Sequence, residues 1–422
     1  MRSRLLPLFA FAAFTAVAHA QPWPQFRGPD ARGSATGKDI PSAFSEKDGI
    51  LWKLKIPGKG NSSPIVWDKF LFMETASDDG RERFLVCVDV SKPALAWKRS
   101  IPAEKAHTHV KNTMASSTPA TDGERVYAAF WDGANQSLWC YTIKGEPVWN
   151  VPLGPFASEH GSGASPVLYK DFVYFADDMD KRSTLYCFDK KTGSPVWKKE
   201  RPAFRACYSA PLIIGGVAGR PPELVVTSSM AITSYDPEKG DVLWNWKWDW
   251  SSVKKKDFPL RTIATPAFVS GVLCASSGDG GGDRLTSGIV LEGQGKETKT
   301  RIAWTNKKDF PYVPCVLEKG GYFYFVNDGG FAGCYDVKKG TRVWYERADD
   351  AKVAFTASPV MIDDRVFAAS EAGDVYAFAA DPKGFNRLGK SSLGEMIRAT
   401  PAVADGRLYV RGAQHLYCIG KK

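Results

Sequence analysis

Short runs of alternating apolar and polar residues, separated by turns, make up most of this 422-residue chain. Residues 125–129 (RVYAA) are typical, because they follow an Asp122-Gly123 turn and alternate as a half-buried strand does. No stretch beyond the first twenty residues shows a convincing helical period. The pattern predicts an all-β protein.

One frame recurs along the chain, with its fullest form in residues 187–197 (CFDKKTGSPVW). It reads as the end of a strand, an Asp-to-Gly turn and a returning strand that carries a Trp. The frame returns in residues 234–244 and 334–344, with Pro in the Gly position in 87–97 and one residue shorter in 140–149. Units repeated roughly every 40–60 residues indicate an array whose members bury their faces against each other.

A second marker recurs with the same spacing as the first. Each unit opens with a small residue, then Pro, then an apolar run, and Pro is tolerated at the start of a strand. The eight pairs are Ser63-Pro64, Thr118-Pro119, Ser165-Pro166, Ala210-Pro211, Thr265-Pro266, Val313-Pro314, Ser358-Pro359 and Thr400-Pro401. Each unit then contains four short strands joined by turns. That is the content of one blade of a β-propeller.

Eight openings require eight outer strands, but no Trp follows the last strand near Leu416. We expect the strand at residues 50–54 to pair there and close an eight-bladed ring, which removes an exposed edge. Seven blades plus a hairpin is the alternative. Leu388 falls near the Trp position of the seventh blade. The Trp residues expected in structural docking positions are Trp52, Trp97, Trp149, Trp197, Trp244, Trp304 and Trp344.

The first twenty residues have the features of a secretion signal: Arg2 and Arg4, an apolar run, and a small-x-small cleavage site at 18–20. We expect an exported protein, periplasmic or extracellular, that is soluble after cleavage and not lipidated, because Gln21 rather than Cys would be the new N-terminus. An uncleaved anchor is the alternative. Residues 21–49 then form a Pro/Gly-rich arm, and residues 50–422 form the propeller.

The formal net charge of +10 can favour anionic partners, although a solvated surface is the simpler interpretation. Eight Cys in an exported chain suggest disulfides. Cys87, Cys140, Cys187, Cys334 and Cys418 however occupy the same position in different blades, beyond bridging distance, so we expect them to be small buried residues. Cys207, Cys274 and Cys315 could form at most one disulfide. No Cys-x-x-Cys occurs, so no zinc site is expected.

The repeated frame resembles the tryptophan-docking motif of the pyrroloquinoline-quinone-like (PQQ-like) propeller superfamily over residues 50–422. The resemblance implies an eight-bladed ring in which an outer-strand Trp, such as Trp197, packs against the neighbouring blade near a Gly such as Gly193. Residues 23–29 (WPQFRGP) resemble the leader of exported propellers of this superfamily. We expect this arm to lie across the ring with Trp23 and Phe26 docked.

Two branches of this superfamily differ in chemistry. Quinoprotein dehydrogenases hold the quinone and a calcium ion and oxidise alcohols or sugars, whereas the lipoprotein BamB is a non-catalytic scaffold that binds proteins through its loops. The present chain has neither the adjacent Cys pair nor the long insertions of the first branch. It also lacks the lipid-anchoring Cys of the second. The resemblance therefore carries the fold and leaves the function open.

Basic residues lie on the loops that lead from each outer strand to the next inner strand, where they would surround the channel. They are Arg205, Arg261 and Arg398, joined by His107, His109, Lys111, His160 and Lys352. Such a ring could bind a carboxylate-rich cofactor, a phosphate or an acidic partner loop. The alternative is a set of solvated charges paired to nearby Asp or Glu. His107 and His109 would point to opposite faces of an extended chain, so we expect no shared metal.

Two further runs are candidates for binding. The Gly-rich segment 277–283 could ligate a cation through Asp279 and Asp283, but such segments usually only turn. In segment 244–250 (WNWKWDW), alternation places Trp246, Trp248 and Trp250 on one face. An exposed row of this kind could stack sugars or anchor a protein, and packing between blades is the alternative. No catalytic frame of Ser, His and Asp or of Cys and His occurs.

These observations favour a non-enzymatic, monomeric scaffold for protein or polysaccharide contacts in the cell envelope. We expect an envelope protein or an anionic polysaccharide as partner, no nucleic acid and no transmembrane segment. One alternative is an oxidoreductase similar to PQQ-dependent alcohol or sugar dehydrogenases, with PQQ and calcium as cofactors. The other is a secreted carbohydrate-binding module that uses Trp246, Trp248 and Trp250.

Overall fold

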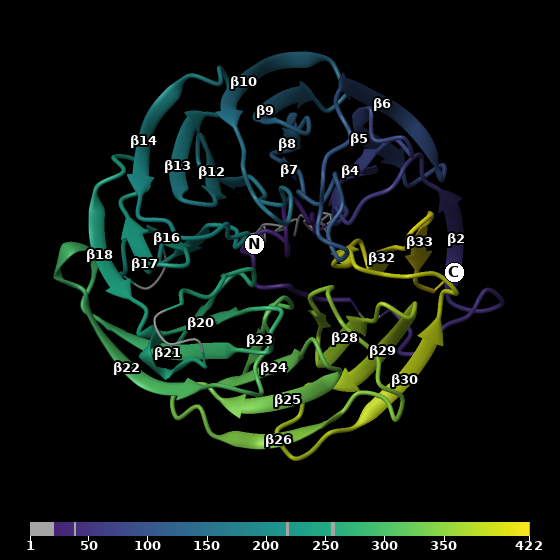
Figure 1. The fold of residues 1–422 in the computed structure, drawn as a ribbon. Coiled ribbons are helices and arrows are strands. Elements are labelled where there is room, and N and C mark those ends of the chain that lie inside the picture. The colour runs from purple at the N-terminus through teal and green to yellow at the C-terminus, as the bar shows by residue number, and fades with distance from the viewer. Residues whose placement is uncertain (1–20, 38, 217–218, 255–257, 422) are drawn as a thin grey trace, which may run out of the picture.

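The computed structural model describes residues 21–421 except 38, 217–218 and 255–257. The predicted secretion signal, residues 1–20, lies outside the described residues. Eight sheets of antiparallel strands form a ring around a central channel (Figure 1). Two short 3-10 helices, η1 (Trp250–Ser252) and η2 (Gly295–Glu297), are the helical elements of the described chain. The all-β, eight-bladed architecture is confirmed, and the alternative of seven blades with a hairpin is wrong.

Each blade runs from an inner strand to an outer strand in chain order. Blade 1 contains β3 (Ile65–Trp67), β4 (Phe70–Ala76), β5 (Glu82–Asp89) and β6 (Ala94–Pro102). Blade 2 contains β7 (Ala120–Thr121), β8 (Arg125–Trp131), β9 (Asn135–Thr142) and β10 (Pro147–Pro155). Blade 3 contains β11 (Val167–Tyr169), β12 (Phe172–Met179), β13 (Arg182–Asp189) and β14 (Pro195–Arg201). Blade 4 contains β15 (Leu212–Ile214), β16 (Glu223–Thr227), β17 (Ala231–Tyr235) and β18 (Val242–Lys247).

The second half of the ring repeats this plan. Blade 5 contains β19 (Ala267–Val269), β20 (Val272–Gly278), β21 (Arg284–Glu292) and β22 (Lys299–Asn306). Blade 6 contains β23 (Leu317–Lys319), β24 (Tyr322–Val326), β25 (Phe331–Asp336) and β26 (Arg342–Arg347). Blade 7 contains β27 (Val360–Ile362), β28 (Arg365–Ala369), β29 (Asp374–Ala379) and β30 (Arg387–Ser392), with β1 (Ser34–Ala35) added in parallel to β27. Blade 8 contains β31 (Ala402–Ala404), β32 (Arg407–Arg411) and β33 (His415–Ile419), with β2 (Ile50–Lys55) as its outer strand.

The ring closes through β2, as the count of outer strands predicted. Leu54 pairs with Leu416, and Trp52 pairs with Cys418. A buried arginine adds a second closing contact, because Arg411 Nη1 donates to the carbonyl oxygens of Ser62 and Glu74 in blade 1, each at 2.8 Å. The first and last parts of the chain are thus joined by both backbone and side-chain hydrogen bonds.

Most outer-strand Trp residues dock on the turn of the following blade. Trp197 donates from Nε1 to the carbonyl oxygen of Pro237 at 3.1 Å and covers Gly240. Gly240 has a φ of +69°, and a Cβ there would lie 2.7 Å from the indole ring. Gly193 receives Trp149 in the same way, so the Gly that a Trp covers belongs to the next unit. The indole N–H groups that donate in this way to a backbone carbonyl oxygen of the next blade belong to Trp97, Trp149, Trp197, Trp304 and Trp344.

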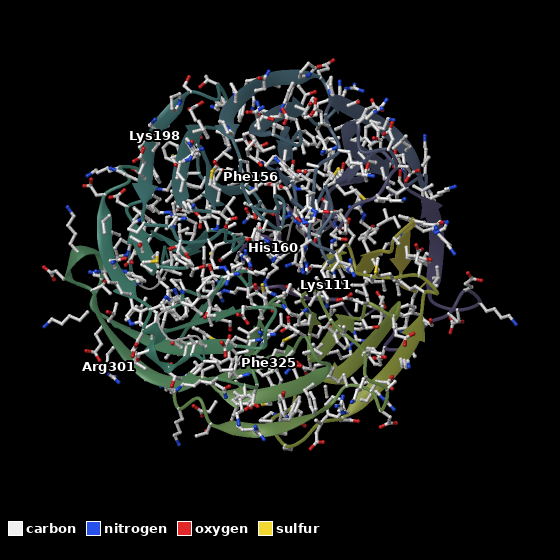
Figure 2. The ribbon with its side chains drawn as sticks, in the orientation of Figure 1. Lys111, Phe156, His160, Lys198, Arg301 and Phe325 are labelled. Atoms are coloured by element: carbon white, nitrogen blue, oxygen red, sulfur yellow. The ribbon has the colours of Figure 1, made fainter. Side chains whose placement is uncertain are left out.

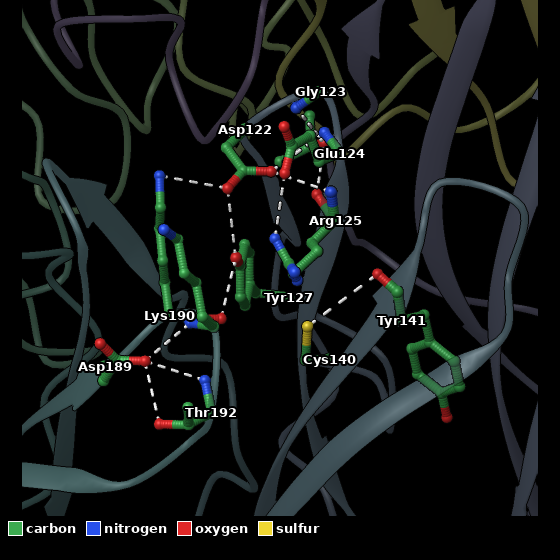
Figure 3. A network of polar contacts seen from close by, with 12 residues as sticks. Asp122, Gly123, Glu124, Arg125, Tyr127, Cys140, Tyr141, Asp189, Lys190 and Thr192 are labelled. Carbon is green, nitrogen blue, oxygen red and sulfur yellow. Dashed lines mark hydrogen bonds and ion pairs between the residues drawn. The ribbon is translucent and has the colours of Figure 1, made fainter.

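Figure 3 shows how one such turn connects two blades. Lys190, on the β13–β14 turn, accepts through its carbonyl oxygen from Tyr127 Oη at 3.1 Å. The same oxygen also accepts from Trp149 Nε1 at 3.2 Å. Its ammonium pairs with Asp122 Oδ2 at 3.2 Å. Asp189 holds the turn by accepting from the backbone N–H of Thr192 at 2.9 Å. The Asp, Gly and Trp of the frame are therefore committed to joining blades.

Blades 4, 7 and 8 depart from this plan. In blade 8, the indole N–H of Trp52 is buried with no hydrogen-bond partner among the described residues. Trp244 donates to Glu223 Oε2 of its own blade at 2.6 Å. In blade 7 the residue in register with the Trp position is Gly389, which pairs with Ala377, and not Leu388 as expected. The same bulge precedes this position in blades 3 and 7, but Cys187 and Trp197 are ten residues apart whereas Ala377 and Gly389 are twelve apart, so the longer turn between β29 and β30 shifts the position. The backbone of the N-terminal arm occupies the vacated space, with Ser42 O 2.3 Å from where a Cβ of Gly389 would lie.

The arm crosses the centre of the ring (Figure 1). Trp23 is buried and forms an antiparallel bridge with Val66 of blade 1. Arg27, also buried, donates from Nη2 to the carbonyl oxygen of Val316 in blade 6 at 2.7 Å. Gly37 N then donates to Asp363 on the β27–β28 turn. Such turns lie at the end of a blade opposite to the outer-to-inner loops, so the arm closes that end of the channel.

The Cys residues are buried and carry no disulfide. They lie opposite the Trp in several blades, as Cys187 does with Trp197, where a small side chain leaves room for the indole. No helix among the described residues is long and apolar enough to cross a membrane.

Candidate functional site

A cavity of about 470 Å³ lies in the central channel. Its wall comes from the starts of the inner strands and from the outer-to-inner loops of blades all around the ring, and Phe26 of the arm lines it from the closed end. Residues of the β20–β21 and β24–β25 loops, among them Asp279 and Asp328, also line it. The cavity therefore opens on the face that carries the predicted basic loops.

A chain of hydrogen bonds runs around the cavity wall. In each link, the backbone N–H of one inner-strand residue donates to the side chain of the equivalent residue in the next blade. The six links run from Thr265 to Cys315, Ser358, Thr400, Ser63, Thr118 and Ser165 in that order. Cys315, rather than Val313, holds this position in blade 6. Ala210 interrupts the chain because it has no side-chain acceptor. The wall is thus rigid and its hydroxyls are largely committed.

One side of the mouth is held by a partly buried carboxylate. Glu371 accepts from Lys111 Nζ at 2.7 Å and from Arg398 Nη2 at 2.9 Å, and Arg398 Nη1 donates to the carbonyl oxygen of Val110 at 2.9 Å. Burial alone would raise the pKa of Glu371, but hydrogen bonds from Lys111, Thr356 and Arg398 lower it below its usual value. These contacts hold the loop that follows β6 against Glu371 and Arg398, so that the loop extends across the mouth of the cavity. Of the two interpretations of the rim charges, pairing to a local acid holds for Arg398.

The opposite side of the mouth carries His160, whose label lies with that of Lys111 near the centre of the ring in Figure 2. The rings of His109 and His160 stack at 4.8 Å with an interplanar angle of 13°. His160 Nε2 lies 3.2 Å from Arg261 Nη1. Burial, followed by the charges of Arg261 and His109, lowers the pKa of His160 to about 4. His160 is therefore neutral at pH 7 and accepts the hydrogen bond from Arg261.

Arg205 and Arg261 form a second, poorly neutralised cationic pair. Arg261 is only 3% exposed, and among the described residues its nearest carboxylate is Glu159 at 3.7 Å, whose side chain is 80% exposed. No carboxylate of the described residues lies within 4 Å of Arg205, which rests on the Phe258 ring at 4.9 Å. Burial, and then the charge of Arg261, lowers the pKa of Arg205. His160 Nδ1, Arg205 Nη1 and Arg261 Nε are buried with no hydrogen-bond partner in the described part of the chain.

The predicted rim residues thus fall into two groups on either side of the mouth. His160, Arg205 and Arg261 come together, and Arg398 joins Lys111. His107 is exposed and does not line the cavity. Lys352 is exposed as well.

The prediction of an exposed Trp row is wrong. Trp246, Trp248 and Trp250 are buried, and the indoles of Trp248 and Trp250 donate to the carbonyl oxygens of Ser228 and Ser229. Helix η1 turns Trp250 inward, and the three rings pack on each other. These residues belong to the core shared by blades 4 and 5. The alternative, packing between blades, is what the structure shows.

The Gly-rich segment is a hairpin loop between β20 and β21. Asp283 N donates to Asp279 Oδ1 at 3.1 Å, and Arg284 Nη1 donates to the carbonyl oxygen of Asp279 at 2.7 Å. Among the described residues, no three His, Cys, Asp or Glu gather where they could hold a metal ion. The loop is closed by its own hydrogen bonds.

Several residues of the site were not predicted from the sequence. Glu371, Tyr208 and Tyr312 line or support the mouth, and Asp328 accepts from the backbone N–H of Tyr312 at 2.7 Å. Asp328 lies in an Asn-Asp-Gly-Gly run that reads only as a turn. Glu371 follows a strand by two residues, a position that offers no sign of its partners in other blades.

The fold and the site define an eight-bladed PQQ-like β-propeller with a central cavity that opens on one face. Residues 134–382 match the family described as outer membrane protein assembly factor BamB, and the chain belongs to this family. No curated protein matches the chain.

Solved structures of related shape come from proteins with different roles. BamB from Moraxella catarrhalis is 14% identical over 88% of this chain and 99% of its own, with a TM-score of 0.63. The quinohemoprotein alcohol dehydrogenase from Comamonas testosteroni is 12% identical over 95% of this chain and 81% of its own, with a TM-score of 0.64. Sqt1 from Saccharomyces cerevisiae is 13% identical over 92% of this chain and 99% of its own, with a TM-score of 0.58. At these identities the likeness shows the fold alone.

Proposed function

We propose that this chain is an exported, non-enzymatic scaffold of the cell envelope that holds a protein or polysaccharide partner at the mouth of its cavity. The observation that carries the proposal is that the carboxylates at the mouth are already engaged by basic side chains or by backbone N–H groups. Glu371 is neutralised by Lys111 and Arg398, and both oxygens of Asp328 accept backbone N–H groups. They therefore serve as positioning groups for the loops, and none forms an acid–base couple aimed at the cavity. Membership of the BamB family supports the same conclusion.

A second candidate function is quinone-dependent oxidation of alcohols or sugars. The central position and volume of the cavity, about 470 Å³, favour it. The residues do not fit a quinone held with calcium, however, because calcium takes six to eight oxygen ligands. The carboxylates of Glu371, Asp328 and Asp279 are already engaged by side chains or by loop N–H groups. The chain also has no adjacent Cys pair.

The two functions are separated by adding PQQ and calcium to the protein lacking residues 1–20. We expect no shift in quinone absorbance and no dye reduction with primary alcohols or aldoses. A bound quinone that reduces the dye would overturn the scaffold proposal.

A positive test uses a photo-cross-linking residue at Val110, which lies at the mouth and is 80% exposed. We expect light-dependent adducts in cells that export the protein. The same residue at Ile302, on the outer strand β22, is the control and should give none. A chain that forms no adduct from Val110, or equal adducts from both positions, would contradict the proposal.

A further inference from the structure

Beside the cavity mouth lies a partly exposed surface that combines aromatic, aliphatic and cationic side chains. We call it the Phe204 surface, and it consists of Phe204, Arg205, Met230 and Phe258. Phe204 is 43% exposed and Met230 is 36% exposed. The Phe204 and Phe258 rings meet edge to face at 5.2 Å. The backbone N–H groups of Phe204 and Arg205 both point to Ser229 Oγ, which places them against the turn that carries Met230.

The elements that hold this surface come from neighbouring blades. Phe204 and Arg205 follow β14, Met230 lies between β16 and β17, and Phe258 lies between β18 and β19. The surface is therefore built from three separate loops of neighbouring blades. Large exposed apolar side chains next to an Arg are unusual on a free surface, and Phe, Met and Arg are enriched in protein interfaces.

Among the described residues, the surface is positively charged because Arg205 and the nearby Arg261 both lack an effective counter-ion. Arg261 is near enough to lower the pKa of Arg205, and both are partly desolvated. Glu159 is too exposed to neutralise Arg261 effectively. Asp279 interacts with Arg205 more weakly than Arg261 does. A carboxylate placed on Arg205 would relieve this repulsion and gain charge-assisted hydrogen bonds.

We propose that the Phe204 surface binds an extended segment of a partner protein. An Asp or Glu of the segment lies on Arg205, and a neighbouring aliphatic or aromatic side chain packs against Phe204 and Met230. This inference names the partner class for the proposed scaffold function and rests on it. The apolar half of the surface favours a peptide over an acidic polysaccharide, which brings carboxylates but no apolar side chain.

Selection from a random peptide display library on the protein lacking residues 1–20 tests the inference. We expect enriched peptides to carry an acid next to Leu, Ile or Phe. In fluorescence anisotropy, Arg205→Gln should weaken the best peptide about tenfold or more, and Phe204→Ala several-fold. Binding should also weaken at high ionic strength. Phe204 is exposed, and Arg205 is half-buried with no carboxylate of the described residues paired to it, so both variants should keep the wild-type circular dichroism spectrum.

Matched controls lie on the outer strand β22, far from the mouth. Arg301 is an exposed arginine there, labelled at the periphery in Figure 2, and Ile302 is an exposed aliphatic residue. Arg301→Gln and Ile302→Ala should leave the peptide affinity unchanged. The inference is overturned if no peptide is enriched, if enriched peptides lack acids, if Arg205→Gln binds them as well as wild type, or if polygalacturonate displaces them. Adducts from Val110 that persist after such a failure would show that the scaffold proposal survives without this surface.

Discussion

At the scale of single residues, the contact between an outer-strand Trp and the Gly of the next blade is the unit of cohesion in this ring. Trp197→Ala removes the ring that covers Gly240 and leaves the carbonyl oxygen of Pro237 without its donor. We expect the free energy of unfolding to fall by about 2–4 kcal/mol, because Trp197 is only partly buried. Trp197→Phe keeps most of the packing and should cost about 1–2 kcal/mol. Urea denaturation followed by circular dichroism measures both.

The control for this prediction is the adjacent exposed residue. Val196→Ala should change the free energy of unfolding by less than about 0.5 kcal/mol. Equal losses at positions 196 and 197 would show that the docking contact does not hold neighbouring blades together.

Asp177 predicts a pH dependence of stability. It is 1% exposed, and neither carboxyl oxygen has a partner among the described residues. Burial, and then the charge of Asp178, raises the pKa of Asp177 to about 7. The unfolded carboxyl ionises near pH 4, so the folded state binds the extra proton between about pH 4 and 7, and stability falls as pH rises through this range. Asn is neutral throughout. The free energy of unfolding of Asp177→Asn, relative to that of wild type, should therefore rise by about 2–3 kcal/mol between about pH 5 and about pH 8.

Urea midpoints at the two pH values measure this gain. Asp350→Asn, in an exposed loop, is the control and should show no such trend. A difference between Asp177→Asn and wild type that does not change with pH would contradict the assignment.

The sequence could not sort the basic residues of the outer-to-inner loops into paired and unpaired groups, and His107 and Lys352 among them do not line the cavity. Arg205, Arg261 and Arg398 all precede an inner strand, and that position alone places them near the channel. Whether an Arg is paired depends on residues from other blades. Glu371 neutralises Arg398, whereas Arg205 has no such partner among the residues that the structure describes. For Trp248, alternation gives the face of the strand, but what covers that face is set by helix η1 and blade 5.

At the scale of elements, the arm replaces a missing side chain. Gly389 stands where other outer strands carry the docking Trp, and the backbone at Ser42 fills the space. Gly389→Ala would place a Cβ 2.3 Å from Ser42 O, so the arm must move. We expect a loss of about 1–3 kcal/mol, typical of overpacking, and faster chymotrypsin cleavage after Phe44.

The control for the arm is Gly384→Ala, because a Cβ at Gly384 has no atom within 4 Å. Its cleavage rate and unfolding midpoint should match those of wild type. A Gly389→Ala variant with an unchanged cleavage rate would show that the arm does not depend on this gap.

The repeated frame predicted the strands well because each strand is short and bounded by turns with distinct chemistry. The errors were shifts of one or two residues. The turn between β29 and β30 is two residues longer than the β13–β14 turn, which brings Gly389 rather than Leu388 into register with the Trp position. In blade 6, Cys315 takes the wall position two residues after Val313. Bulges and added loop residues depend on pairing geometry, which a sequence pattern does not report.

At the scale of the whole molecule, the count of outer strands predicted that the ring closes and that residues 50–54 pair with the last strand near Leu416. The structure adds what joins the blades around the cavity. The six links of the wall pass through blades 5, 6, 7, 8, 1, 2 and 3, so they cross the junction where the chain begins and ends. Closure at β2 therefore affects the cavity as well as the edge of blade 8.

Two truncated chains test the role of closure. A chain that begins at residue 57 lacks β2 and leaves the hydrogen-bonding edge of β33 unpaired, which favours pairing with other chains. We expect it to associate and to unfold at lower urea. A chain that begins at residue 45 lacks most of the arm but keeps β2. In sedimentation it should therefore show the same oligomeric state as the protein that lacks only residues 1–20. Because the edge of β33 accepts a strand, adding a synthetic peptide of residues 45–57 to the shorter chain should reverse its association. If the chain from residue 57 sediments and unfolds like the chain from residue 45, strand β2 is dispensable, and the contacts of Arg411 with blade 1 must close the ring.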